Sequence, residues 1–132
     1  MDLRERFGRP LRLACIGGGP DSWIGRMHRG AAEFDGWWRV AAGVFSGDPA
    51  RSRDAGAALG LEAARCYGSV DELLAAEARR ADRVDAVAIM TPNDTHHRFA
   101  AAALDAGLDV ICDKPVSQTH AQALDLVARV KA

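Results

Sequence analysis

Short apolar runs alternate along the chain with segments whose apolar residues recur at helical spacing. A short apolar run predicts a strand buried on both faces of a sheet, and helical spacing predicts an amphipathic helix. The expected strands are residues 11–16, 40–45, 64–67, 85–90 and 109–112. The expected helices are residues 24–34, 49–60, a helix that opens at residue 69, 95–106 and 117–131. Because parallel strands need crossover helices, this alternation predicts a doubly wound parallel sheet of the α/β class.

Residues with known roles at helix ends support these assignments. Asp48 and Pro49 would form an N-cap followed by a proline at the first helical position. Ser69 and Glu72 stand at the spacing of a capping box. Gly107 provides a stop after the alanine-rich helix. These boundaries leave the chain ending in a helix that no further strand follows, as a truncated fold would end.

The length and charge of the chain limit what it can be. A chain of 132 residues has room for one domain, so we predict a single domain over residues 1–132, with residues 1–10 as a poorly structured lead. No apolar run reaches the ~18 residues that span a bilayer, and the charged start differs from a signal peptide. A formal net charge of -1 does not indicate a surface for nucleic acid. We therefore expect a cytoplasmic protein without membrane or nucleic-acid partners.

The three cysteines, Cys15, Cys66 and Cys112, form no CxxC pair. Cys15 and Cys112 fall within predicted strands, so buried and reduced thiols are the expected state. The sequence shows no group of residues typical of a metal site, and we predict none.

A glycine-rich turn joins the first predicted strand to the first predicted helix, over residues 17–25. This is where a doubly wound sheet binds a pyrophosphate, because glycines admit the anion and the helix start attracts it. Gly17 and Gly19 would shape the turn, and Gly25 would let the helix pack close to the strand. The third glycine comes later than in the usual fingerprint, so the loop is longer. A tight turn that binds nothing is the alternative.

The end of the second strand decides between the two nicotinamide dinucleotides. An acidic residue usually binds the adenosine ribose about 20 residues beyond the last glycine. Ser46 stands at that place, and Arg51 and Arg53 on the next helix could neutralise a 2′-phosphate. The pattern therefore favours NADP slightly over NAD. The alternatives are that these arginines form a solvated helix face and that Asp48 serves NAD.

Polar residues follow the fourth predicted strand, over residues 91–97. Ligands in such sheets bind beyond the carboxyl ends of the strands. Asn93 can donate and accept, and His96 could hydrogen-bond a ribose or substrate hydroxyl, with an exposed helix position as its alternative. Thr95 is expected to cap the next helix. His28 and His120 are interpreted as ordinary helix residues.

The fifth predicted strand ends in Asp113, Lys114 and Pro115. Arginine supplies almost all of the basic residues, and Lys131 is the only other lysine. A lysine at a strand's carboxyl end suggests a compact ammonium that binds or polarises a substrate oxygen, so we predict that Lys114 is catalytic. A surface charge after a strand is the alternative.

Taken together, three segments resemble the N-terminal domain of the Gfo/Idh/MocA oxidoreductase family, over residues 11–131. The segments are the glycine turn, residues 91–96, and Asp113-Lys114-Pro115, which is similar to the family's Glu-Lys-Pro signature. The resemblance implies a Rossmann fold that binds NAD or NADP, with Lys114 reaching the reacting hydroxyl. The predicted cofactor-binding residues are Gly17, Gly19, Ser22, Trp23, Ile24, Ser46, Arg51, Thr91, Pro92, Asn93, His96 and Asp113.

The resemblance also implies hydride transfer between the nicotinamide and a sugar or polyol carbon. Family members continue into a second α/β domain that covers the substrate and typically mediates oligomerisation, and this sequence holds none of it. We therefore expect cofactor binding without useful turnover, and a homo-oligomer. Two alternatives remain: a dinucleotide sensor or regulatory subunit completed by a partner chain, and a structural domain in which residues 20–23 fill the pyrophosphate site.

Overall fold

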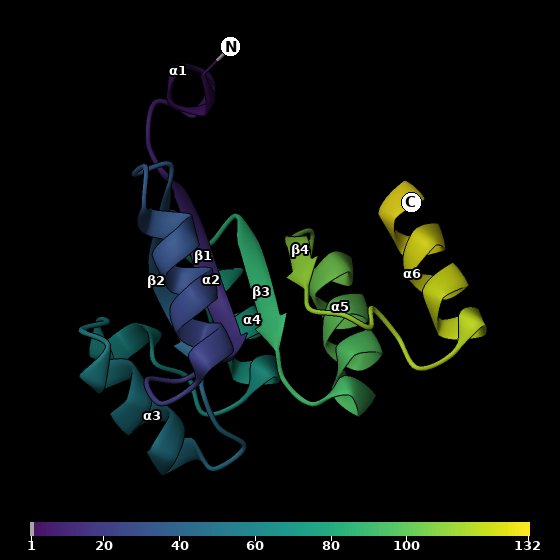
Figure 1. Cartoon of the computed structure of the whole chain (residues 1–132). Helices are drawn as coiled ribbons and strands as arrows, with labels where there is room; N and C mark the ends of the chain where they lie inside the picture. The colour runs from purple at the N-terminus through teal and green to yellow at the C-terminus, as the bar shows by residue number, and fades with distance from the viewer. Residues whose placement is uncertain (1) are drawn as a thin grey trace.

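Four parallel strands form one sheet in the computed structural model, which describes residues 2–132 of the chain. The strands are β1 (Leu11–Gly17), β2 (Trp38–Val44), β3 (Ala86–Met90) and β4 (Asp109–Cys112). They lie in the order β2-β1-β3-β4, and every pair is parallel (Figure 1). The sheet therefore runs outward from β1 in both directions, as the predicted doubly wound fold requires.

Helices connect the strands and flank the sheet. The α-helices are α1 (Leu3–Phe7), α2 (Trp23–Glu33), α3 (Pro49–Ala58), α4 (Val70–Glu77), α5 (His96–Asp105) and α6 (His120–Lys131). Two 3-10 helices, η1 (Ala63–Arg65) and η2 (Asn93–Thr95), lie in the connections. No helix among the described residues combines the length and the apolar composition needed to cross a membrane.

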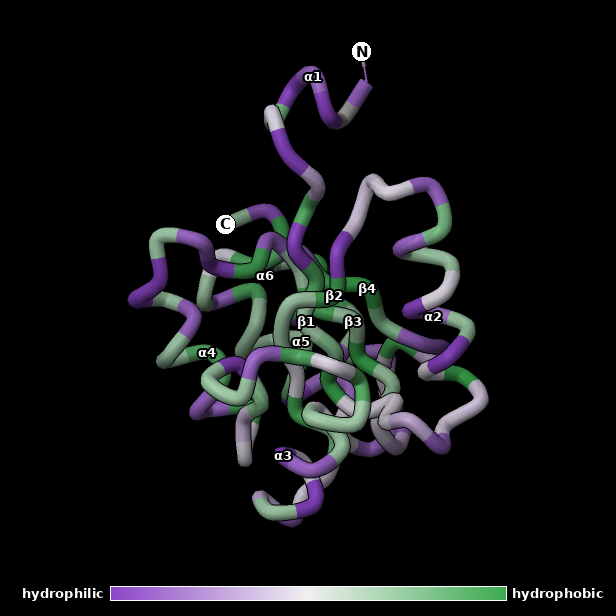
Figure 2. Tube along the Cα trace, turned by 90° about the vertical axis from the view of Figure 1, so that its left-hand side faces the viewer, coloured by the Kyte–Doolittle hydropathy of each residue, from purple (hydrophilic) through white to green (hydrophobic). Residues whose placement is uncertain are grey.

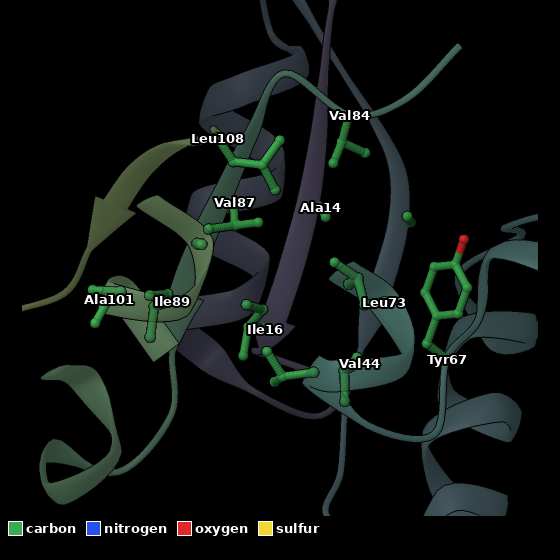
Figure 3. Packing of buried hydrophobic residues seen from close by; sticks show 14 of the residues in the cluster. Ala14, Ile16, Val44, Tyr67, Leu73, Val84, Val87, Ile89, Ala101 and Leu108 are labelled. Carbon is green, nitrogen blue, oxygen red and sulfur yellow. The ribbon is translucent and has the colours of Figure 1, made fainter. Parts of the chain in front are cut away.

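Strand side chains alternate between two separate cores, because successive residues of a strand point to opposite faces. Ile16 and Ile89 belong to one core, together with Leu73 of α4 (Figure 3). Leu13 and Met90 belong to the other core, against α2. Figure 2 shows hydrophobic residues gathered along the central strands. Burial on both faces explains why these strands are nearly continuous apolar runs in the sequence.

The prediction of a third strand at residues 64–67 is wrong. Residues Ala63–Arg65 form the 3-10 helix η1, in which the Cys66 amide donates back to the Ala63 carbonyl at 3.3 Å. Only Cys66 bridges Gly43 of β2 in the parallel sense, and the Tyr67 amide donates to the Gly43 carbonyl at 2.9 Å. The chain therefore touches the sheet edge at one point where a full strand was expected.

Helix starts also differ from the sequence prediction in detail. The last helix begins at His120, because the Thr119 hydroxyl caps it by accepting from the Gln122 amide at 3.1 Å. Thr95 does not cap α5 as predicted. Its hydroxyl donates to the Pro92 carbonyl at 2.6 Å, which closes the 3-10 turn in front of that helix.

The N-terminal segment carries more structure than the poorly structured lead that we expected over residues 1–10. The Asp2 carboxylate accepts from the Arg4 amide at 2.8 Å and caps the short helix α1. The Arg4 guanidinium donates to the Asp35 carbonyl at 2.7 Å, and Arg9 pairs with Asp85 at 2.8 Å. These contacts join the segment to the sheet domain.

Candidate functional site

The carboxyl ends of the parallel strands meet at one edge of the sheet (Figure 1). The glycine turn follows β1, Ser46 follows β2, Thr91 follows β3 and Asp113 follows β4. Most of the predicted site residues therefore lie on loops at this edge, where open α/β sheets bind ligands.

Two glycines of the turn adopt backbone conformations that other residues rarely use. Gly17 has φ 78° and Gly18 has φ 69°, both in the left-handed region. Gly19, which we predicted to shape the turn with Gly17, does not have a positive φ. The second turn-forming glycine is therefore Gly18, and sequence reasoning placed that role one residue too late.

Helix α2 packs tightly against the turn. A Cβ built on Gly25 would lie only 2.1 Å from the Gly18 carbonyl oxygen, so a glycine is required there, as predicted. The Arg29 guanidinium, one turn further along α2, donates to the carbonyls of Gly18 and Gly19. Sequence reasoning missed Arg29, because nothing in the local pattern distinguishes it from the other arginines. Its contacts hold these two carbonyls toward the helix.

The start of α2 presents free backbone donors. The Ser22 hydroxyl accepts from the Gly25 amide at 3.0 Å and so serves as the N-cap, which is a different use from the predicted contact with a cofactor. Within residues 2–132 the amides of Trp23 and Ile24 have no hydrogen-bond partner. Free first-turn amides and the helix dipole together favour an anion at this point.

Position 19 leaves room beside these amides. A Cβ built on Gly19 would meet nothing nearer than the Phe45 Cβ at 3.7 Å, which is an ordinary contact. Gly19, Ser22 and Ser46 line an open hollow of about 610 Å³. The packing of the fold does not require a glycine at position 19. An anionic group bound over the amides would require one, because a side chain there would occupy its space. The turn therefore fits the pyrophosphate of a dinucleotide.

A second hollow of about 330 Å³ adjoins the first and lies between the ends of β1, β2 and β3. Its lining is Ile16, Gly17, Val44, Phe45, Ser46, Gly47, Gly68, Ser69, Val70, Met90, Thr91, Pro92 and Phe99. Ser46 is shared by both hollows. The lining is mostly apolar, as is usual for sites that take a planar ligand ring.

Of the residues after β2, one caps helix α3 and others line the hollow. The Asp48 carboxylate accepts from the Arg51 amide at 2.9 Å and caps α3. The Arg51 side chain lines the larger hollow with Ser46. Arg53, the other arginine considered for a 2′-phosphate, instead lies 3.4 Å from the Glu72 carboxylate. Arg51 is therefore the arginine that shares a hollow with Ser46.

His96 does not face the site as predicted. The residue is 1% exposed. Its Nδ1 lies 2.6 Å from the Pro115 carbonyl oxygen, and its Nε2 lies 2.8 Å from the Thr91 carbonyl oxygen. Both ring nitrogens are thus occupied by the protein backbone, and the ring cannot also bond a ribose or substrate hydroxyl. By contrast, Pro92 and Asn93 are exposed at the same edge, and Pro92 and Thr91 line the smaller hollow.

Lys114 is exposed at the end of the sheet, after β4. The preceding Asp113, predicted to border the cofactor, accepts a hydrogen bond from His28 Nε2 at 2.7 Å. His28 lies within α2, as interpreted from the sequence, and its ring also reaches the segment after β4. No signal in the sequence connects two residues that lie so far apart along the chain.

The thiols do not contribute a nucleophile to this edge. Burial raises the pKa of the Cys15 thiol to about 12, and burial also raises the pKa values of Cys66 and Cys112. All three cysteines are free, and Cys15 and Cys66 are buried as expected, whereas Cys112 is partly exposed. Because the thiolate is the reactive form, a raised pKa lowers the reactivity of these thiols.

A doubly wound parallel sheet with a glycine turn and free helix-start amides at its carboxyl edge defines a dinucleotide-binding Rossmann domain. Residues 11–132 match the family described as "Oxidoreductase family, NAD-binding Rossmann fold", which is the Gfo/Idh/MocA family. The chain belongs to this family, and the predicted resemblance is confirmed.

Relatives of known sequence and structure agree with this assignment. An uncharacterised oxidoreductase of Bacillus subtilis is 42% identical over 92% of this chain and 31% of its own length. Inositol 2-dehydrogenase 4 of Saccharopolyspora erythraea is 34% identical over 90% of this chain and 32% of its own.

The crystal structure of an inositol dehydrogenase homologue from Azotobacter vinelandii, complexed with NADH and myo-inositol, is similar with a TM-score of 0.92. It is 41% identical and is matched over 99% of this chain and 35% of its own chain. The chain therefore spans about a third of the length of the relatives that it matches.

Proposed function

We propose that this chain is the cofactor-binding part of an NAD(P)-dependent dehydrogenase that acts on a hydroxyl of a sugar or polyol. The observation that carries the proposal is the pair of free amides, Trp23 and Ile24, beside a side-chain-free position at Gly19. The substrate class rests on relatives, among them the homologue bound to NADH and myo-inositol. When bound, the dinucleotide supplies a nicotinamide that accepts or returns a hydride.

In this proposal each group at the carboxyl edge has one task. The amides of Trp23 and Ile24 bind the pyrophosphate through the start of α2. The Ser46 hydroxyl and the Arg51 guanidinium bind the adenosine ribose, with a small preference for its 2′-phosphate. Lys114 Nζ binds and polarises the substrate oxygen from the end of β4.

The chain by itself should bind the dinucleotide without useful turnover. Lys114 is exposed, and within residues 2–132 its ammonium makes no hydrogen bond or ion pair that would fix an acid or base beside it. Without a group that excludes water and orients the substrate, most of the rate enhancement is lost. Val116 is 50% exposed and Val130 of α6 67% exposed, so this side of the domain fits an association surface, and we propose a homo-oligomer.

Calorimetric titration of the purified chain with NAD, NADH, NADP and NADPH tests the proposal. Gly19→Trp places a large ring over the free amides and should abolish saturable binding. Gly30→Trp is the matched control, because a Cβ at Gly30 meets nothing within 4 Å and the residue lies on the exposed side of α2. It should bind like the wild type.

The outcomes separate the competing functions. Saturable binding that only Gly19→Trp removes supports the dinucleotide site, and a stronger loss of NADP(H) than NAD(H) affinity in Arg51→Ala supports the assigned 2′-phosphate contact. A folded wild-type chain that binds none of the four dinucleotides would overturn the proposal and favour a structural domain.

A further inference from the structure

The segment that carries Lys114 is fixed on both sides of that residue. Before it, the Asp113 amide donates to the Ile89 carbonyl at 3.1 Å, which continues the ladder between β3 and β4. The Asp113 carboxylate accepts from His28 at 2.7 Å. After it, the Pro115 carbonyl faces His96 at 2.6 Å. Lys114 is the exposed residue between these anchors.

His28 reaches this segment from helix α2. Its ring and the Asp113 carboxylate are about three-quarters buried, with 23% and 26% of their side chains exposed. Because a carboxylate only accepts, His28 Nε2 carries the proton of this hydrogen bond. Partial burial reduces competition from water, so the contact defines the Asp113 side chain more firmly than a surface pair would.

His96 reaches the segment from the opposite direction, at the start of α5. Its buried ring lies between the carbonyl oxygens of Thr91 and Pro115, which belong to the loops after β3 and β4. Carbonyl oxygens only accept, so the ring donates to a carbonyl through each nitrogen that carries a proton, and the tautomer decides which carbonyl receives the bond. One side chain thus contacts both of these loops at the carboxyl edge of the sheet.

We infer that His28 and His96 are positioning residues that set the direction of Lys114 by holding the backbone and side chains on either side of it. The importance of that direction rests on the proposed function, in which Lys114 meets the substrate oxygen. The positional effect itself is a property of the free protein. It can therefore be measured without any dinucleotide or substrate.

The chain suits this measurement because it contains two lysines, Lys114 and Lys131. Lysine labelled with ¹³C at Cε gives one NMR signal from each, and a Lys131→Arg variant assigns them. Competitive acylation by an amine-reactive reagent reports the reactivity of each amine. Lys131, at the end of α6, serves as an internal reference.

His28→Ala and His96→Ala should shift the Lys114 signal and change its acylation rate relative to Lys131 by about threefold or more. His28→Gln should restore the wild-type signal, because its amide can still donate to Asp113. His97→Ala is the matched control. His97 also lies in the first turn of α5 and pairs with a carboxylate, Asp125 at 2.8 Å, instead of with a group of the lysine segment.

Folded His28→Ala and His96→Ala variants with an unchanged Lys114 signal and acylation ratio would overturn the inference, as would an equal change in His97→Ala. If an alanine variant fails to fold, His28→Asn and His96→Gln replace it in the same measurement. Each keeps a polar side chain of different length, so it should still change the Lys114 signal. If the wild-type chain binds no dinucleotide but the two alanine variants still change the Lys114 signal as expected, the proposed function is rejected and the inference stands.

Discussion

The two ends of the sheet are built in opposite ways. At the amino ends of β1 and β3, charged side chains are paired with one another and with the backbone, as Arg9 with Asp85. At the carboxyl ends, glycines, capping hydroxyls and free amides leave hollows along the edge. The comparison teaches that the carboxyl edge keeps free donors at the start of α2 for a ligand, while pairs such as His28 with Asp113 hold the loops around it.

Glu77 is the centre of the most buried polar network near the amino ends. Glu77 is 1% exposed. Its carboxylate accepts four hydrogen bonds, from Arg65 Nε at 3.0 Å, Arg65 Nη2 at 2.7 Å, the Tyr67 hydroxyl at 2.8 Å and the Val84 amide at 3.0 Å. The network joins η1, α4 and the approach to β3. Every lone pair on this buried carboxylate is thereby used.

Glu77→Ala should have the largest effect on stability, about 3–5 kcal/mol in the free energy of unfolding, because it leaves the Arg65 guanidinium buried and unpaired. Chemical denaturation followed by circular dichroism measures it. Glu62→Ala is the matched control, since Glu62 is exposed, and it should cost less than about 0.5 kcal/mol. An equal loss of unfolding free energy in the two variants would contradict the claim that the Glu77 network stabilises the fold.

Asp85 should give a smaller, pH-dependent effect. Partial burial would raise its pKa, but hydrogen bonds from the Arg9 guanidinium and the Arg12 amide outweigh burial and hold the pKa below its ordinary value. A carboxyl whose pKa is lowered by folding stabilises the protein above the unfolded pKa, and this contribution is lost as pH falls through the folded pKa. The loss therefore begins near pH 4 and continues below it.

Asp85→Asn should thus destabilise the protein by about 1.5 kcal/mol at pH 7, and the difference from the wild type should shrink as the pH falls below about 4. Urea unfolding of both proteins across this pH range measures the difference. A difference that stays constant with pH would contradict the assigned role of the Asp85 carboxylate.

Much of the fold follows from the sequence because its strands are buried on both faces. The run at residues 109–112 predicts β4 at its observed bounds, and the run at 11–16 predicts β1 to within one residue. The run at 64–67 has the same local character but forms η1 instead. There Arg65 is buried by its contacts with Glu77, which lies on a later helix. A local pattern does not contain that partner.

The candidate site also has a part that the sequence predicts and a part that it does not. Its position could be predicted, since the glycine turn and the polar residues after β3 and β4 mark the carboxyl edge. The contacts of the two histidines could not be predicted, because in the sequence His96 resembles its polar neighbours and His28 resembles part of a helix face. Their partners, Pro115 and Asp113, come close only in the folded chain.

The central claim is that the dinucleotide binds at the carboxyl edge through the start of α2. The most direct test is NMR mapping of amide chemical shifts in the ¹⁵N-labelled chain during titration with NADH and with NADPH. We expect the largest shifts at the amides of Trp23 and Ile24, with further shifts at Gly19 and Ser46. Shifts confined to the amino end, or no saturable shifts in the folded chain, would contradict the claim.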